Sequence, residues 1–192
     1  MNPRKTVIHV THETTQKVGG ITTVLQGLIT SDRYRDAVGR TILIGPWFHK
    51  DGPANLRLGP QGRVQYSAGD GITEHPYRSL FSEIERKFGV AIVYGRRTLH
   101  GPMNFRKADV EVVLIDVTHA DPHPVNALKG WLFDEFGIES NRYEHRQEYE
   151  QYVRLAPAAI AVLRAISASD PNNPAVLISH EYMGMPTMLA AI

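Results

Sequence analysis

Short apolar segments recur along this chain, and stretches with helical spacing of apolar residues separate them. Ile21, Val24 and Leu28, for example, follow one another at the spacing of one helix face. Such alternation of strands and helices produces a mostly parallel sheet with helices on both faces, the Rossmann-like α/β architecture. The predicted strands are KTVIHV (5–10), RTILIG (40–45), VAIVY (90–94), EVVLID (111–116) and AVLIS (175–179).

Composition narrows the class of protein. The chain has 192 residues, which suits one domain at the large end of the usual range. Its 21 basic and 20 acidic residues give a net charge of +1, which argues against a dedicated nucleic-acid binder. The absence of cysteine excludes disulfides and thiolate metal sites. No stretch has the apolar length of a membrane span, and MNPRKTVIHV lacks a signal-peptide apolar region. We therefore expect a cytoplasmic protein with no nucleic-acid or membrane partner.

The last segment of the chain predicts an incomplete helix. In MPTMLAAI, Pro186 suits the first turn of a helix, yet only about two turns fit before Ile192. A helix this short covers little of a sheet. We therefore expect residues 1–192 to form one domain of a longer protein, truncated before the next domain.

The first candidate site is Lys17-Val18-Gly19-Gly20, between the first strand and the first helix. Parallel α/β sheets bind ligands at the carboxyl ends of their strands. Glycine allows a ligand to approach the backbone closely, and the start of a helix presents unpaired N–H groups to an anion. With the charge of Lys17, this stretch suits a phosphate or diphosphate. The competing interpretation is a tight strand-to-helix turn with a surface lysine.

Two further candidates follow other predicted strands. His180, with Glu181 beside it, comes directly after AVLIS and suits a hydrogen bond to a sugar hydroxyl or a proton transfer. Arg96 and Arg97 follow VAIVY, where an arginine binds anions or carboxylates. The competing interpretations are a histidine packed under the next helix and a pair of solvated arginines.

A metal site is the weaker interpretation of one loop. His119, Asp121 and His123 alternate after the fourth predicted strand, as metal ligands on an extended segment do. Pro122 and Pro124, however, indicate a turn-rich loop, and the sequence offers no fourth ligand. We therefore expect no metal and no bound cofactor.

These motifs, in this order, resemble the N-terminal half of glycogen and starch synthases, and most closely the animal and fungal glycogen synthases. Their pattern E-x-x-x-K-V-G-G-I-x-T-V is matched at Glu13, Lys17, Gly19, Gly20 and Ile21. ILIGPW, VYGRR, VVLIDV, LKGWLFDEFGIES and LISHEYMG resemble later segments of the same proteins. The chain departs from the pattern at Arg97 and Tyr182, which stand where tryptophan is usual, and at Ser179, where an aromatic residue is usual.

The resemblance implies the first of the two Rossmann-like domains of a GT-B glycosyltransferase. Such enzymes transfer glucose from ADP-glucose or UDP-glucose to an α-1,4-glucan, with retention of configuration and without a metal. By position, Gly19 and Gly20 would face the donor diphosphate, with Lys17 close to the donor or acceptor. His180 would contact the transferred glucose near its 6-hydroxyl, with Glu181 beside it. Glu13 and Arg96 would line the cleft.

The resemblance also implies that a second, C-terminal domain supplies the residues that clamp the diphosphate. We therefore expect the isolated chain to be inactive in transfer. Two alternatives remain open. One is another GT-B glycosyltransferase with a different sugar or acceptor, and the other is a non-enzymatic module that binds glucan or nucleotide.

Overall fold

The computed structural model describes residues 4–15, 19–48, 53–59, 61–102 and 105–192. Its strands are β1 (Lys5–Val10), β2 (Val38–Pro46), β3 (Gly62–Ser67), β4 (Ala91–His100), β5 (Lys107–Asp116) and β6 (Val176–Ser179). Its α-helices are α1 (Ile21–Ile29), α2 (Asp32–Ala37), α3 (Arg78–Phe88), α4 (Pro122–Phe136), α5 (Gln147–Ala165) and α6 (Glu181–Leu189). The described residues also include the short 3₁₀ segments η1 (Ala54–Leu56), η2 (Ala68–Asp70) and η4 (Ser140–Tyr143).

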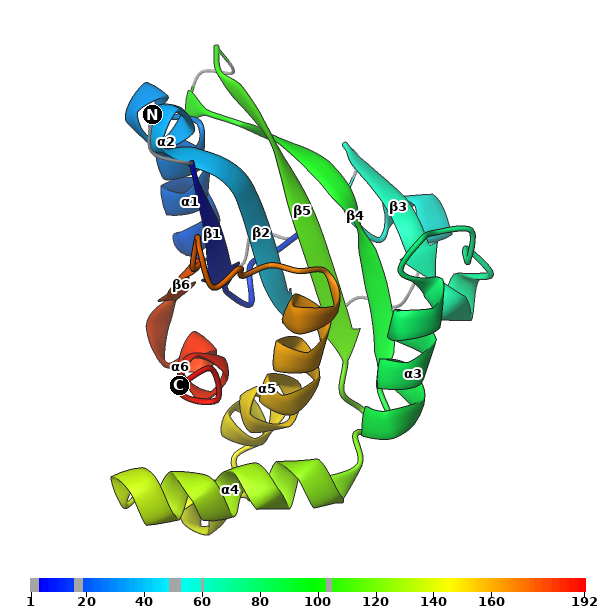
Figure 1. Ribbon diagram of the computed structural model, residues 1–192, viewed down its shortest axis with the longest axis vertical. Helices are drawn as coiled ribbons and strands as arrows, with labels where there is room; N and C mark the ends of the chain where they lie inside the picture. The colour runs from blue at the N-terminus through cyan, green and yellow to red at the C-terminus, as the bar shows by residue number, and fades with distance from the viewer. Residues whose placement is uncertain (1–3, 16–18, 49–52, 60, 103–104) are drawn as a thin grey trace.

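The strands form one six-stranded sheet in the order β3-β4-β5-β2-β1-β6 (Figure 1). The pairs β1–β2, β1–β6 and β2–β5 are parallel, whereas β4 runs antiparallel to both β3 and β5. Five strands therefore point the same way, and their carboxyl ends lie at one edge. The predicted α/β fold with a mostly parallel sheet is confirmed.

Helices cover both faces of the sheet because successive strand residues point to opposite sides. Ile42 and Ile44 of β2 pack in a core with residues of α3, α5 and α6. Leu43, between them, packs in a second core with Ile21 and Leu25 of α1. This explains the nearly continuous apolar runs of β2 and β5, since strands buried on both faces have no solvated side. In the described part of the chain, no helix is long and apolar enough to span a membrane.

Three sequence predictions about element boundaries are wrong. The strand predicted as EVVLID begins four residues earlier, at Lys107. The strand predicted to end at Tyr94 continues to His100 and pairs along its length with β5. The last helix begins at Glu181 rather than at Pro186, which lies inside it. For β4, the local pattern marks where an apolar run ends, whereas pairing with β5 decides where the strand ends. For the helix, the error came from placing Pro186 in the first turn, although the intrahelical hydrogen bonds begin five residues earlier.

Candidate functional site

The carboxyl edge of the sheet brings together segments that are far apart in the sequence. Val10 of β1 pairs with Ser179 of β6, and the amide of His180 donates to the carbonyl of Val10 at 3.0 Å. The loop after β1 and the residues after β6 are therefore neighbours. The ends of β2 and β5 lie next along the same edge, where the amide of Trp47 donates to the carbonyl of Ile115 at 2.9 Å.

Glu13 caps the start of α1 with its side-chain carboxylate. One oxygen accepts a hydrogen bond from the amide of Gly19, and the other accepts from the amide and the hydroxyl of Thr22, both at 2.7 Å. The side chain is almost completely buried, and burial alone would raise its pKa. The hydrogen bonds from Thr22 and Gly19, with His12 nearby, lower the pKa of Glu13 below its ordinary value. A carboxylate of the chain itself therefore occupies the place where an anion would meet the helix.

The two glycines of the loop differ in what they allow. A Cβ at Gly19 would lie 2.9 Å from Oε1 of Glu13, so Gly19 makes room for the cap. A Cβ at Gly20 would meet nothing within 4 Å, and Gly20 is exposed at the start of α1. Gly20 therefore offers the open backbone that the sequence predicted for both glycines. Lys17 lies outside the described residues.

His180 is linked to a buried histidine. Its Nε2 lies 2.9 Å from Nδ1 of His9, and Nε2 of His9 lies 3.0 Å from the hydroxyl of Tyr34. Burial, and to a smaller degree the charge on His180, lowers the pKa of His9 to about 4. Burial also lowers the pKa of His180, although Glu181 acts in the opposite direction. Both rings are therefore neutral at neutral pH.

Acidification tests this buried pair. The pKa of His9 falls from 6.5 to about 4 on folding, so the unfolded chain takes up the proton first. The stability that depends on neutral His9 is complete above pH 6.5 and is lost as the pH falls toward 4. Between roughly pH 7.5 and 5, we expect His9 alone to lower the free energy of unfolding by about 2 kcal/mol. Urea unfolding at a series of pH values measures this loss.

The control for this prediction is His9→Phe, which removes the titrating ring and retains an aromatic group against Tyr34 and His180. The variant should lose clearly less stability over the same pH range. Two parallel pH curves would contradict the assignment of a neutral, buried His9.

Glu181 carries local backbone strain beside His180. Its φ is 59°, in the left-handed region that side chains other than glycine rarely adopt. The hydroxyl of Ser179 donates to the carbonyl of Glu181 at 3.0 Å and supports this turn into α6. A Cβ at Gly184 would meet Oγ of Ser179 at 2.7 Å and the carbonyl of Val10 at 2.8 Å. The close packing of α6 against β1 thus holds Glu181 and His180 at the carboxyl edge.

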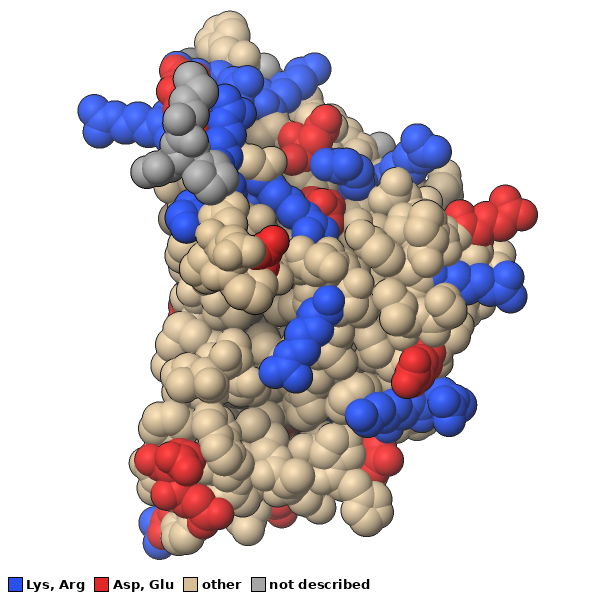
Figure 2. Space-filling model, viewed as in Figure 1, with Lys and Arg blue, Asp and Glu red and all other residues tan. Residues whose placement is uncertain are grey.

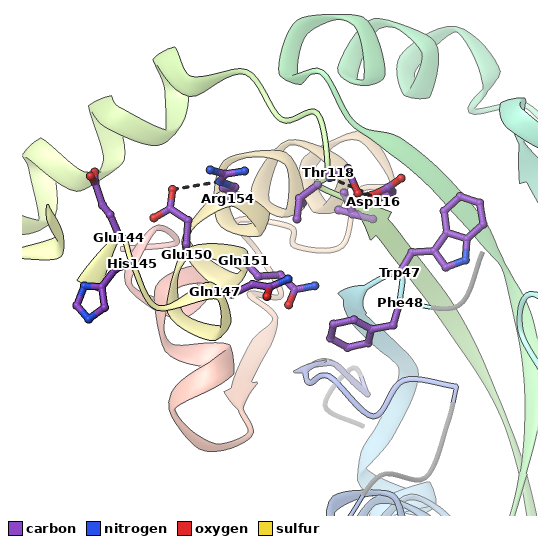
Figure 3. A pocket seen from close by; sticks show the side chains of 12 residues that line it. Trp47, Phe48, Asp116, Thr118, Glu144, His145, Gln147, Glu150, Gln151 and Arg154 are labelled. Atoms are coloured by element: carbon purple, nitrogen blue, oxygen red, sulfur yellow. Dashed lines mark hydrogen bonds and ion pairs between the residues drawn. The ribbon is translucent and has the colours of Figure 1, made fainter. Parts of the chain in front are cut away.

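A cavity of about 480 Å³ opens at the carboxyl ends of β2 and β5 (Figure 3). Trp47 and Phe48 stand on one side, and polar residues of α5 stand on the other. Glu150 is held in place by Arg154 at 3.1 Å and by the buried Lys129 at 2.8 Å. The cavity is lined by Trp47, Phe48, Ile115, Asp116, Val117, Thr118, Glu144, His145, Gln147, Glu150, Gln151 and Arg154.

Sequence reasoning missed this cavity. Trp47 and Phe48 come shortly after the predicted strand RTILIG, separated from it by Pro46, and this position near a strand end could have indicated a site. Glu150 and Gln151 line the cavity, but they belong to the strongly charged stretch 139–151, where charge alone does not indicate a cavity. A polar wall and an aromatic wall together suit a sugar, whose hydroxyls need hydrogen-bond partners and whose C–H faces pack on aromatic rings.

Arg96 does not join the cluster. It lies midway along the antiparallel strand β4, paired with Glu111 of β5, and its side chain is exposed. The expectation that it follows the end of a strand is therefore wrong. Arg97 instead reaches the loop after β1, where its Nη1 donates to the carbonyl of Thr14 at 2.8 Å. Arg97 thereby supports the loop that carries Glu13. Burial lowers the pKa of the Arg97 guanidinium.

The basic side chains on the face drawn in Figure 2 gather away from the carboxyl edge of the sheet. Figure 2 shows Lys and Arg side chains gathered at the end where α2 and the connection between β4 and β5 lie. The carboxyl edge lies at the other end of the sheet.

The loop considered as a metal site instead caps a helix. Asp121 of this loop accepts a hydrogen bond from the amide of His123 at 2.8 Å and caps α4. Among the described residues, no group of three or more His, Asp or Glu side chains could hold a metal ion.

Comparison with known proteins adds no assignment. No model of a known protein family matches this chain, and no curated protein matches it.

Proposed function

We propose that this chain is the N-terminal domain of a retaining glucosyltransferase of the glycogen and starch synthase type. It would work in the cytoplasm with a C-terminal GT-B domain and transfer glucose from ADP-glucose or UDP-glucose to an α-1,4-glucan. The observation that carries the proposal is the meeting of three features at one edge of a mostly parallel sheet. These features are the glycine loop after β1, His180 after β6 and the sugar-sized cavity after β2 and β5.

The donor side of the proposal rests on the loop and His180. Glu13 already binds Gly19 and Thr22, so the open backbone at Gly20 is the place where a donor phosphate can approach. His180 lies beside this loop because β1 and β6 are neighbours. A neutral histidine suits a sugar hydroxyl, since it hydrogen-bonds the hydroxyl without carrying a charge.

The acceptor side rests on the cavity. Asp116 and Glu150 offer carboxylate oxygens to sugar hydroxyls, and Trp47 offers a ring face. The guanidinium of Arg57 lies 5.2 Å from the centre of the Trp47 ring and orients it. Phe48 is 42% exposed, so it is available to a ligand. These groups suit an uncharged glucan chain better than a phosphate.

Tryptophan fluorescence tests the acceptor side. The chain has two tryptophans, and Trp47 lines the cavity whereas Trp131 lies on α4. In a Trp131→Phe variant, maltoheptaose is expected to change the emission of Trp47 in a saturable way. A β-1,4-linked oligosaccharide of similar length should change it much less, because its chain has a different curvature.

The matched control is Trp47→Phe, which leaves Trp131 as the reporter and should not respond to maltoheptaose. Equal responses from both tryptophans, or none from Trp47 at millimolar sugar, would remove the glucan from the proposal. Transfer is then measured with ADP-glucose and UDP-glucose in a protein that joins this chain to its C-terminal domain. Glucan binding without transfer would favour the binding module.

A further inference from the structure

Four polar side chains from four different segments form one hydrogen-bonded chain that ends at His180. Thr41 Oγ1 of β2 lies 3.1 Å from the hydroxyl of Tyr34 of α2, and that hydroxyl lies 3.0 Å from Nε2 of His9. Nδ1 of His9 lies 2.9 Å from Nε2 of His180, which is 171 residues away in sequence. His9 is fully buried within β1. The two rings also pack against each other, with centroids 5.1 Å apart.

The chain of bonds allows only two arrangements of protons. A neutral imidazole has one N–H donor and one nitrogen acceptor, so the role of one nitrogen fixes the role of the other. If Tyr34 donates to His9, then Nδ1 of His9 donates to His180, and the proton of His180 sits on Nδ1. If His9 donates to Tyr34 instead, every bond reverses and the proton of His180 sits on Nε2.

The chemistry of Tyr34 and His9 decides between the two arrangements. A phenol is a stronger acid than a neutral imidazole, and therefore the better donor, while an imidazole nitrogen is the better acceptor. The hydroxyl of Tyr34 therefore donates to Nε2 of His9. The hydroxyl of Thr41 is free to rotate and to donate to the oxygen of Tyr34.

We propose that His9, Tyr34 and Thr41 are positioning residues that hold His180 in its Nδ1–H form, so that His180 offers a hydrogen-bond donor at the carboxyl edge. Within the described residues, the structure gives Nδ1 of His180 no hydrogen-bond partner, and His180 is only partly buried, so this nitrogen is the one left for a ligand. Its partner is an oxygen with a free lone pair. If the proposed function holds, that oxygen is a sugar hydroxyl, and His180 binds it as a donor and does not remove its proton.

Nitrogen-15 NMR of the histidine rings tests this inference on the chain as it is. Long-range nitrogen–proton correlations at neutral pH distinguish a protonated ring nitrogen from an acceptor nitrogen. For both His180 and His9, we expect a protonated Nδ1 and an unprotonated Nε2. A protonated Nε2 on His180 would overturn the proposal. The spectrum needs no substrate, so its result is independent of whether the protein transfers glucose.

Variants then test which groups set the tautomer. Tyr34→Phe removes one hydroxyl and should lose the Nδ1–H signal of His180 in favour of Nε2–H. Tyr149→Phe is the control, because it removes a hydroxyl bonded to Ser140 elsewhere in the structure and should change neither histidine. An unchanged His180 tautomer in Tyr34→Phe would overturn the role of Tyr34.

Rescue separates positioning from packing at His9. His9→Asn places an amide N–H where Nδ1–H of His9 stands, so His180 should keep its Nδ1–H form. His9→Leu fills similar space without a donor, so His180 should lose that form. The same tautomer in both variants would show that His9 acts by packing alone and would overturn the proposal.

Discussion

Replacing Gly45 by alanine is expected to destabilise the protein by about 3–5 kcal/mol, the range of severe overpacking in a closed structure. Gly45 lies in β2, where the loop after β1 crosses it. A Cβ there would lie 1.9 Å from the carbonyl oxygen of Thr11 and 3.0 Å from Cγ2 of Thr14. The first contact is with backbone, which cannot rotate away. The loop would have to move, and the hydrogen bond from Thr11 to Ile44 at 3.0 Å would be lost.

Gly27→Ala is the matched control for this prediction. Gly27 lies inside α1, and a Cβ there meets nothing within 4 Å. Alanine is favoured over glycine in a helix by roughly 0.5–1 kcal/mol, so this variant should be slightly more stable than the wild type. Urea denaturation with a fixed slope measures both changes. If Gly45→Ala proved as mild as Gly27→Ala, the loop after β1 could not lie against β2 as described.

Glu13→Ala is expected to cost about 3 kcal/mol, because charged hydrogen bonds to buried groups are among the costlier ones to remove. The amides of Gly19 and Thr22 and the hydroxyl of Thr22 would all lose their acceptor. The start of α1 would also lose a negative charge, which favours a helix N-terminus. Glu13→Gln should cost less, since it keeps one oxygen for these donors.

The pH dependence of the same variant has a definite sign. Because folding lowers the pKa of Glu13, the stabilisation is present above the ordinary carboxyl pKa and is lost as the pH falls through the folded value. The gap between wild type and Glu13→Ala should therefore narrow in acid. Glu83→Ala, which removes an exposed carboxylate from α3, is the control and should stay within about half a kcal/mol.

The stability of Glu13→Ala also tests where the phosphate of a nucleotide-sugar donor can bind. An unchanged free energy of unfolding in Glu13→Ala would mean that the carboxylate does not cap α1. The start of the helix would then be open to a phosphate, as the sequence alone predicted. The expected loss of stability would support the assignment of the phosphate-approach position to Gly20 alone.

The direction of β4 shows where a local pattern stops being informative. The run VAIVY identifies a strand, but it does not contain the strand's direction. The short connection 101–106 between β4 and β5 allows only an antiparallel pair, since a parallel crossover needs a dozen or more residues. Because the strand was expected to end at Tyr94, this constraint was not visible. Arg96 and Arg97 were consequently placed after the end of a strand, whereas both lie within β4.

The sequence by itself determined most of the strands of this protein, although β3 was not among the predicted ones. Apolar runs produced β1, β2, β5 and β6 at the predicted places, and Gly89 and Gly137 end α3 and α4 because each adopts a positive φ that other residues resist. These are local properties, decided by a few neighbouring residues.

Only the tertiary structure decided which polar side chains meet at the carboxyl edge of the sheet. In the sequence, His9 is only a polar residue within an apolar strand. The pairing of β1 with β6 brings it next to His180. Glu13 likewise became a cap because the loop folds over Gly45, and contacts between distant segments follow from packing rather than from local propensity.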